Sequence, residues 1–329
     1  MTQVARLHGA HDIRLSDEPA PEPRDGESLV RVEAVGICGS DLHWFDEGGI
    51  GDSRLTTPLV VGHEFAGVAE SGPLAGRRVA VDPAIPCERC ELCREGHPNL
   101  CLNVRFAGHG SWDGALRRHL SWPTHRLHAL PDSLDGVAGA LLEPLGVAIH
   151  SVDLGHVGVG ARVAVVGCGP IGLLIAQVCA AAGASVALAV DPLEHRRAAA
   201  ARAGAAVVVA PDEIQAWEGP EVDVAFEAAG TDEAVDLALR AARPGARVVL
   251  AGIPAGDHTT FSASIARRKG ITLVLVRRMK DVYPRALRLV AAGGIDLQSL
   301  VTHRFPLDRV TEAFAVAARR EGLKVVVEP

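Results

Sequence analysis

The chain has 329 residues, which is more than one ordinary domain and enough to bury a large core, so two domains are the starting expectation. Its net charge of −7 and isoelectric point of about 6.1 give no basic surplus. This charge balance argues against nucleic acid or an anionic membrane as a partner and favours a small molecule.

The N-terminal residues 1–27 are rich in charge and proline and lack the apolar core of a secretory signal, so we expect a cytoplasmic protein. The longest apolar region, 157–190, is interrupted by Arg162, several glycines and Pro170, which argues against a membrane span. Without a secretion signal, the seven cysteines favour metal binding or redox chemistry over a disulfide framework.

The first third of the chain has the pattern of an irregular β domain. Residues 28–34 alternate apolar and polar side chains as a half-buried strand does, and 59–61 and 78–81 are further β-rich runs.

Within this β domain, Cys38 and His63 lie 25 positions apart and form a candidate zinc site. A thiolate and an imidazole suit Zn²⁺, and a catalytic zinc needs three protein ligands with one position left open. Gly36 and Gly39 allow a turn that brings backbone close to a metal. The alternative is a buried cysteine and a core histidine without a shared role.

Four cysteines then follow at short spacing: Cys87, Cys90, Cys93 and Cys101. Four thiolates at this spacing can close a tetrahedral sphere, which is typical of a structural zinc. Two disulfides are the alternative, and a reducing compartment disfavours them. We therefore expect a loop over about 84–103 that a bound zinc ion holds together and that has a structural and not a reactive role.

A β-rich run over 162–167 leads into a glycine-rich turn and a helical segment. The turn holds the fingerprint Gly167, Gly169 and Gly172, with Pro170 and Ile171 between the last two. A second strand over 185–190 ends in Asp191, which lies 19 positions beyond Gly172. This context predicts a dinucleotide-binding βαβ unit, with the pyrophosphate at the helix N-terminus and Asp191 accepting from the ribose 2′-hydroxyl.

Asp191 would also repel a 2′-phosphate, which favours NAD over NADP. Arg196 and Arg197 weaken this preference because they follow closely and could bind that phosphate; otherwise they lie on a solvated helix face. We count Arg196 among the candidate cofactor-binding residues.

Strand and helix signals continue to alternate after Asp191, which predicts a doubly wound parallel sheet. The expected strands are 207–209, 222–226, 246–251, 272–276 and a final one over 324–327. We expect one helix to begin at Thr231 and helical segments to span 281–292 and 308–319.

These motifs, in this order, resemble zinc-dependent medium-chain dehydrogenases along essentially the whole chain, and 36–51 and 143–150 resemble the sorbitol and L-idonate dehydrogenase branch. The resemblance implies an α/β protein with a GroES-like β-rich catalytic domain, 1–144 plus 279–329, and a Rossmann NAD-binding domain, 145–278. It also implies two zinc ions per chain, NAD, and a homodimer or homotetramer.

The resemblance implies further residues at the catalytic zinc. Glu143 matches the third ligand, directly or through water, and Cys38, neutral His63 and Glu143 would together neutralise Zn²⁺. Glu64 would be a nearby or exchanging ligand, or a carboxylate outside the metal's ligands. Asp41 matches the partner that orients the histidine ligand.

The family's proton relay matches Ser40 and His43, which we name with Glu64 as catalytic candidates. Substrate candidates are Trp44, Phe106, Glu143 and Arg278, with His109 and Trp112 as further positions; Arg278 could also bind the cofactor. The chain departs from the branch, because Trp44 replaces a tyrosine, 274–278 lacks a glycine, and the loops around 71–76 and 107–113 look short.

We therefore expect a zinc alcohol or polyol dehydrogenase that oxidises a secondary hydroxyl of a polyol, sugar acid or cyclitol to a ketone, with hydride transfer to NAD. L-threonine 3-dehydrogenase is the alternative enzyme. A zinc- and NAD-binding sensor without turnover is the alternative outside catalysis.

Overall fold

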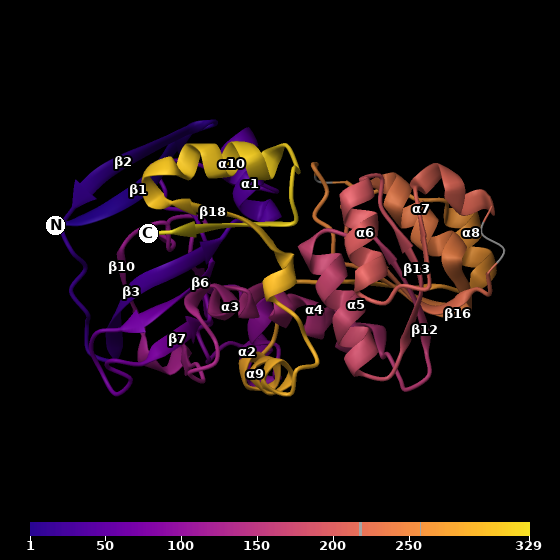
Figure 1. The fold of residues 1–329 in the computed structure, drawn as a ribbon, viewed down its shortest axis with the longest axis horizontal. Helices are drawn as coiled ribbons and strands as arrows, with labels where there is room; N and C mark the ends of the chain where they lie inside the picture. The colour runs from indigo at the N-terminus through magenta and orange to yellow at the C-terminus, as the bar shows by residue number, and fades with distance from the viewer. Residues whose placement is uncertain (217–218, 257) are drawn as a thin grey trace. The chain divides into compact units, whose positions relative to one another are not determined.

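The computed structural model describes residues 1–216, 219–256 and 258–329. The chain forms two compact units, Met1–Glu143 with Leu297–Pro329, and Pro144–Asp296. Both termini belong to the first unit (Figure 1).

The first unit is built on a sheet with the strand order β11-β7-β6-β3-β19-β18, and β10 pairs with β3. Its strands are β3 (Glu27–Gly36), β6 (Glu64–Ala69), β7 (Arg78–Val81), β10 (His119–Pro123), β11 (Leu127–Ala129), β18 (Val301–Pro306) and β19 (Lys324–Glu328). All pairs are antiparallel except β18 with β19. The alternating burial of β3 confirms the strand predicted over 28–34.

Further elements complete the first unit. They are β1 (Thr2–Gly9), β2 (Asp12–Glu18), α1 (Gly39–Glu47), β4 (Gly49–Ile50), β5 (Ser53–Arg54), β8 (Ala84–Ile85), α2 (Glu91–Arg94), η1 (Pro98–Leu100), β9 (Arg105–Phe106), η2 (Thr124–Arg126), α3 (Gly136–Ala140), η4 (Gln298–Leu300), η5 (Leu307–Arg309) and α10 (Val310–Ala318). Phe314 of α10 packs with Phe45 of α1 at 5.0 Å between ring centroids. The C-terminal helix and strand therefore complete a core that begins at the other end of the chain.

The β-rich run 59–61 does not form the strand predicted there, since only Leu59 makes an isolated bridge, to Leu7. Its backbone instead bonds to a crossing segment: Val60 and Val61 accept N–H groups from Gly114 and Leu116. Gly62, with φ of +94°, then turns the chain toward His63. Pattern alone cannot separate such a buried crossing from a strand.

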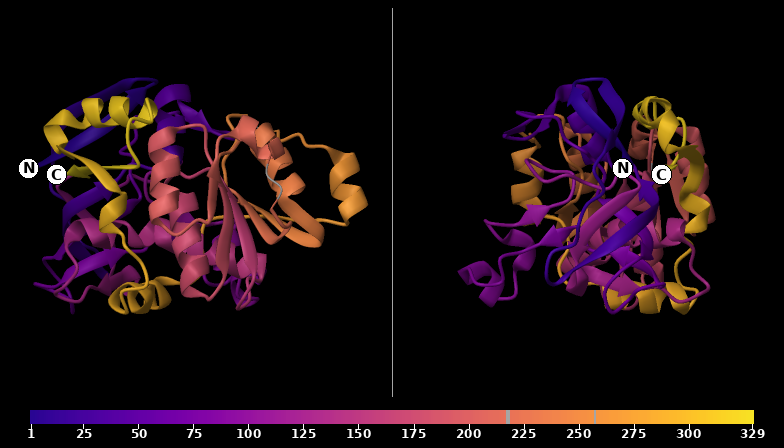
Figure 2. Two further views of the ribbon diagram at one scale, coloured as in Figure 1. Left: turned by 45° about the vertical axis from the view of Figure 1, so that its right-hand side comes forward. Right: turned by 90° about the vertical axis from the view of Figure 1, so that its left-hand side faces the viewer.

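The second unit contains a six-stranded, fully parallel sheet in the order β14-β13-β12-β15-β16-β17, as the predicted doubly wound fold requires. Helices α5 and α6 cover one face and α7 and α8 the other (Figures 1 and 2). The elements are α4 (Leu142–Gly155), β12 (Arg162–Val166), α5 (Pro170–Ala181), β13 (Ser185–Val190), α6 (Glu194–Arg202), β14 (Val207–Val209), η3 (Pro211–Ala216), β15 (Val222–Glu227), α7 (Asp232–Ala241), β16 (Ala242–Leu250), α8 (Ala263–Lys269), β17 (Thr272–Leu275) and α9 (Tyr283–Ala291).

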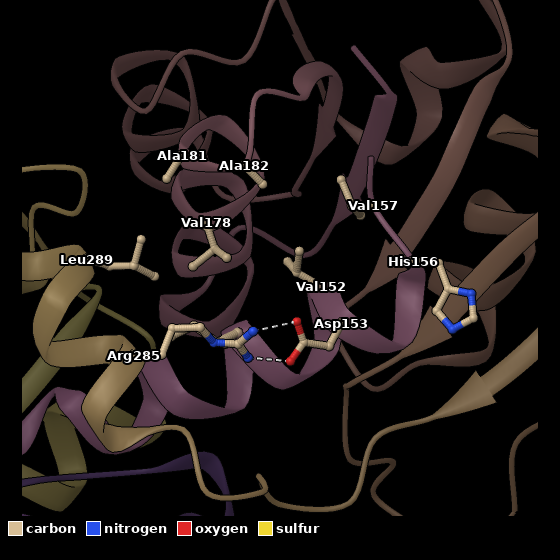
Figure 3. Close-up of a pocket in the computed structure, with 10 residues that line it drawn as sticks. Val152, Asp153, His156, Val157, Val178, Ala181, Ala182, Arg285 and Leu289 are labelled. Carbon is tan, nitrogen blue, oxygen red and sulfur yellow. Dashed lines mark hydrogen bonds and ion pairs between the residues drawn. The ribbon is translucent and has the colours of Figure 1, made fainter. Parts of the chain in front are cut away.

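Helix α9 lies in the second unit, whereas the sequence prediction began the returning segment of the first domain at 279. Arg285 of α9 forms an ion pair with Asp153 of α4 beside a cavity of about 350 Å³. Leu289 and Val178 also line this cavity (Figure 3). These contacts explain why the unit extends to Asp296.

One helical stretch, Gly136–Gly155, is long and apolar enough by length and composition to cross a membrane. However, 83% of its apolar window is buried inside the protein, as in the core helix of a globular fold.

The pairing of β3 with β6 generates a first prediction. A Cβ added at Gly67 would lie 2.0 Å from the backbone oxygen of Arg31, which cannot move without breaking the pair. We expect Gly67→Ala to lower the free energy of unfolding by about 1–3 kcal/mol. Thermal denaturation followed by circular dichroism would measure this loss.

Gly9→Ala is the matched control, because a Cβ there meets nothing within 4 Å. Its expected effect is within about 0.5 kcal/mol. Equal melting temperatures for the two variants would contradict the tight β3–β6 contact.

Candidate active site

The site begins where β3 ends and α1 starts. Cys38 is the N-cap of α1, with φ of −96° and ψ of 158°, and its side chain is half-buried. Asp41, the third residue of the helix, accepts the N–H of Cys38 at 3.0 Å and the N–H of Gly62 at 3.1 Å. One buried carboxylate therefore fixes both segments that carry the candidate ligands.

His63 is oriented by the same carboxylate. Its Nδ1 lies 3.3 Å from Oδ1 of Asp41, and its Nε2 lies 3.5 Å from Oγ of Ser40. Burial lowers the pKa of His63, but Asp41 and Cys38 more than offset this and raise it well above its ordinary value. With Nδ1–H donating to Asp41, Nε2 is the ring nitrogen that a metal ion would bind in place of a proton.

Cys38, His63 and Glu64 bring one donor atom each to a group within 4.8 Å. Thiolate sulfur, imidazole nitrogen and carboxylate oxygen are all zinc ligands. The negative groups around His63 that raise its pKa also attract a divalent cation. The donor set therefore fits a zinc ion.

Glu64 has a second partner in this group. Both of its carboxylate oxygens accept from Nζ of Lys324, at 2.8 and 2.7 Å, and both residues are buried. Both carboxylate oxygens of Glu64 are therefore hydrogen-bonded to the ammonium group of Lys324, which lies near the C-terminus of the chain.

Glu143, the candidate third ligand, is buried near the start of α4. It is not a member of the group within 4.8 Å found among the described residues. Burial raises the pKa of Glu143 to about 7; Glu64 and Asp82 add to this rise, while His63 and Lys324 oppose it. These four groups place Glu143 in the electrostatic surroundings of the Cys38–His63 pair.

Ser40 and His43 lie three positions apart on α1 and so share one face. Nδ1 of His43 lies 2.9 Å from Oε1 of Glu47, one turn further on. The structure thus places the two relay candidates together and adds Glu47 as a partner that orients the imidazole.

The substrate candidates of the first unit differ in exposure. Phe106 is half-buried, with its ring 5.3 Å from that of His63. Trp44 is 1% exposed, belongs to the core, and packs edge-on against His109 at 5.4 Å. Trp112 is 43% exposed, with Arg105 over its ring at 5.1 Å. Phe106 thus combines partial exposure with a ring contact to a candidate ligand.

The four clustered cysteines form a second group with donor atoms within 4.8 Å, and all are free thiols. Sγ of Cys90 lies 3.4 Å from that of Cys93 and 3.9 Å from that of Cys101. A disulfide requires about 2.05 Å, whereas Zn–S bonds of about 2.3 Å in a tetrahedron separate the sulfurs by about 3.8 Å. The spacing fits zinc.

The ionisation of these thiols supports that fit. Backbone N–H groups lower the pKa of Cys87 to about 6, whereas burial and the neighbouring thiols raise the pKa of Cys93 to about 12. The neighbours oppose full ionisation, so a divalent cation is needed to hold four thiolates together.

The glycine fingerprint joins β12 to α5 in the second unit. Gly167 has φ of +96°, and a Cβ at Gly172 would lie 1.8 Å from the carbonyl oxygen of Gly167. Pro170 and Ile171 are the first residues of α5. Its N-terminal N–H groups offer a site for a pyrophosphate, so the loop fits a dinucleotide.

Asp191 follows β13, and its carboxylate accepts the N–H groups of Cys168 at 2.8 Å and Leu193 at 2.9 Å. A Cβ at Gly169 would lie 3.4 Å from Nη1 of Arg196, so this guanidinium lies beside the glycine turn. Arg197 donates to the carbonyl of Asp191. Arg278, after β17, has φ of +54°, a conformation uncommon outside glycine.

Comparison with known proteins decides the family. Residues 24–132 match the alcohol dehydrogenase GroES-like domain, and 170–292 match the zinc-binding dehydrogenase domain. The chain is 35% identical to sorbitol dehydrogenase of Macaca fascicularis, over 98% of this chain and 94% of the relative. It belongs to the zinc-dependent medium-chain dehydrogenases.

Two solved structures of this family are similar throughout. L-idonate 5-dehydrogenase from Escherichia coli has a TM-score of 0.92 at 29% identity, covering 100% of this chain and 98% of that one. A zinc-binding dehydrogenase from Sinorhizobium meliloti, bound to NADP, has a TM-score of 0.91 at 32% identity, covering 100% and 99%. The chain is thus an oxidoreductase of the sorbitol and L-idonate dehydrogenase-like branch, with the GroES-like and Rossmann fold predicted.

Sequence reasoning missed two charged partners in this dehydrogenase. Lys324 is a lone lysine at the start of an apolar run, which is the signal that could have revealed it, because a buried lysine requires an anion. Glu47 stands four positions after His43, the spacing at which helical side chains meet.

The two cysteine-containing groups predict the zinc content of this medium-chain dehydrogenase. We expect two zinc ions per chain in the wild type, and one in Cys38→Ser and in Cys93→Ser, because each variant removes a ligand from a different site. Atomic emission of the purified proteins would measure the content.

Only the Cys93→Ser variant should lose substantial thermal stability, since a structural zinc contributes directly to folding. Cys179→Ala is the control, because this buried thiol belongs to neither group. Two zinc ions retained in Cys38→Ser would refute the first site.

Proposed function

We propose that the protein oxidises a secondary hydroxyl of a polyol, sugar acid or cyclitol to a ketone, with transfer of hydride to NAD. The observation that carries this proposal is the Cys38–His63 pair oriented by buried Asp41, with the Ser40 hydroxyl beside it. The names of the similar sorbitol and L-idonate dehydrogenases support the substrate class.

Cys38 and His63 would hold the catalytic zinc, with Glu64 or Glu143 as the third ligand, and the glycine turn with Asp191 would hold the dinucleotide. When bound, the zinc supplies Lewis-acid chemistry at a hydroxyl, and the nicotinamide accepts hydride. Asp41 keeps Nε2 of His63 aimed at the site, since it holds Nδ1 at 3.3 Å. Cys87, Cys90, Cys93 and Cys101 would hold a second, structural zinc.

The chain's own contribution to the chemistry is the removal of a proton. Ser40, whose Oγ lies 3.5 Å from Nε2 of His63, would accept the proton of the substrate hydroxyl while it gives its own hydroxyl proton onward toward His43. His43, on the same face of α1, would pass the proton to solvent, and Glu47 holds its Nδ1 so that Nε2 can accept. Phe106 would provide an apolar wall for the substrate.

NAD is the proposed cofactor because the carboxylate of Asp191 is fixed by two backbone N–H groups at the end of β13. A fixed negative charge there accepts from a ribose hydroxyl and repels a 2′-phosphate. The relative bound to NADP makes a direct test of both cofactors necessary.

We further propose a homo-oligomeric, cytoplasmic enzyme, dimeric or tetrameric. Free thiols at all seven cysteines suit a reducing compartment. Light scattering of the purified protein would give the oligomeric state, and a monomer would contradict the proposed dimer or tetramer.

A substrate panel tests the proposal most simply. Alditols, aldonates, cyclitols and L-threonine are each offered with NAD, and NADH absorbance is recorded. We expect turnover with at least one polyhydroxylated substrate, and its loss in Cys38→Ser. Turnover with threonine alone would make the chain a threonine dehydrogenase. Full zinc and NAD binding without any turnover would favour a sensor.

Asp191→Asn tests cofactor choice. We expect the ratio of kcat/KM for NAD over NADP to fall on the order of tenfold, a change of about 1.4 kcal/mol, because the repelling charge is lost while one acceptor stays. Arg202→Gln, at the far end of α6, is the control. An unchanged ratio in Asp191→Asn would mean that other residues set the preference.

A further inference from the structure

Glu227 is a buried carboxylate at the carboxyl end of the parallel sheet. It is the last residue of β15, is 1% exposed, and pairs with Val166 of β12 and Leu250 of β16. The sheet runs β14-β13-β12 on one side and β15-β16-β17 on the other, so the chain order reverses between β12 and β15. An open parallel sheet binds its ligand at the carboxyl ends of the strands beside such a reversal.

The carboxylate is held by the loop that follows β15. Its Oε1 accepts the N–H groups of Ala229 at 2.7 Å and Gly230 at 2.6 Å. Burial raises the pKa of Glu227 above its ordinary value, although hydrogen bonds from backbone N–H groups, that of Gly252 among them, oppose the rise. These donors take the place of water around a buried carboxylate.

The loop that follows β16 is tied to the same residue. The carbonyl oxygen of Glu227 accepts the N–H groups of Ala251 at 2.7 Å and Gly252 at 3.1 Å. A Cβ at Gly252 would lie 2.7 Å from Oε2 of Glu227 and 2.2 Å from the nitrogen of Gly230. The two loops therefore touch each other beside the carboxylate, where no side chain fits between them.

The glycine fingerprint adjoins these loops. A Cβ at Gly167 would lie 2.7 Å from the nitrogen of Ala229, and one at Gly230 would lie 2.3 Å from the carbonyl oxygen of Ile253. Ala229 and Ile253 are exposed, whereas Glu227 is buried. Three loops thus present an exposed surface around one buried carboxylate.

The two halves of a dinucleotide extend to opposite sides of the glycine fingerprint. Asp191, the proposed partner of the adenosine ribose, follows β13, which lies on one side of β12. With the pyrophosphate at the start of α5, the nicotinamide half extends the other way, toward the ends of β15 and β16. Residues 228–230 and 251–253 lie at those ends.

We propose that Glu227 is a positioning residue for the nicotinamide half of the cofactor. It holds residues 228–230 and 251–253 together, so that their backbone forms a fixed wall at this end of the sheet. The inference rests on the dinucleotide site proposed above at the glycine fingerprint and Asp191. It gives the two halves of the cofactor different supports, Asp191 for the adenosine half and Glu227, acting through the two loops, for the nicotinamide half.

The experiment compares two ligands on the full-length, zinc-loaded protein. NADH, followed by its fluorescence, probes the whole cofactor site, and ADP, followed by calorimetry, probes only the adenosine and pyrophosphate part. The variant is Glu227→Gln, which keeps the size of the side chain but replaces one acceptor oxygen with a donor. Glu213→Gln is the matched control, because Glu213 also accepts a backbone N–H group, that of Ala210, but is exposed in η3.

We expect Glu227→Gln to weaken NADH binding on the order of tenfold, because hydrogen bonds to a charged acceptor are stronger than those to a neutral one. The KM for NAD should rise in parallel. The dissociation constant of ADP should stay within about twofold of the wild-type value, since the adenosine half has its own support. Glu213→Gln should match the wild type with both ligands.

Gly230→Ala is a second variant for the case that Glu227→Gln does not fold. Its Cβ would displace the carbonyl group of Ile253 while the carboxylate stays in place, so the same selective loss of NADH binding is expected. Gly158→Ala is its control, because a Cβ there meets nothing within 4 Å.

Wild-type NADH affinity in folded Glu227→Gln or Gly230→Ala would overturn the inference and leave Glu227 a purely structural role. Equal weakening of NADH and ADP, or failure of both variants to fold, would overturn it as well, because the carboxylate would then support the whole unit. A wild type that binds neither ligand would instead refute the proposed dinucleotide site, and the inference with it.

Discussion

The buried carboxylate of Asp41 is the contact on which the candidate site depends. It accepts N–H groups from Cys38 and Gly62 and lies against Nδ1 of His63, so it joins the start of α1 to the segment before β6. Burial raises the pKa of Asp41, but His63 and the two backbone N–H groups lower it by more than burial raises it. The pKa of Asp41 therefore lies below its ordinary value. A permanent charge therefore sets the distance between the two proposed ligands and the tautomer of the second.

The ends of the chain meet at the same place. β3 ends at Gly36, two residues before Cys38, β6 begins at Glu64, and β19 adds Lys324 from the C-terminus. Two neighbours of β3 thus provide a carboxylate and an ammonium group beside the thiol that follows β3. The C-terminal strand belongs to the first unit because it pairs with β3 and β18, and the buried ion pair of Lys324 with Glu64 lies at this contact.

Much of this could be predicted from the sequence, because local patterns carried it. The glycine fingerprint, the alternating strands of the second unit and the four clustered cysteines have short spacings whose chemistry is readable directly. Residues 59–61 were wrongly expected to form a strand because their partners, Leu7 and 114–116, are remote in sequence.

The pairing of Lys324 with Glu64 joins positions 260 residues apart, so no local pattern could reveal it. The core position of Trp44 was equally hidden, since the same residue type serves in pockets and in cores. The sorbitol and L-idonate dehydrogenase branch was predictable only by resemblance, because nothing in the residues next to Glu143 marks it as a candidate ligand. Its position relative to the other motifs does. Contacts between distant segments thus account for what the sequence did not reveal.

Anomalous diffraction at the zinc absorption edge, on crystals grown with NAD and a polyol, tests the central claim most directly. We expect two zinc peaks per chain, one bonded to Cys38 and His63 with a substrate oxygen beside Ser40, and one among the four clustered cysteines. A single peak, at the cysteine cluster only, would contradict the proposed catalytic centre.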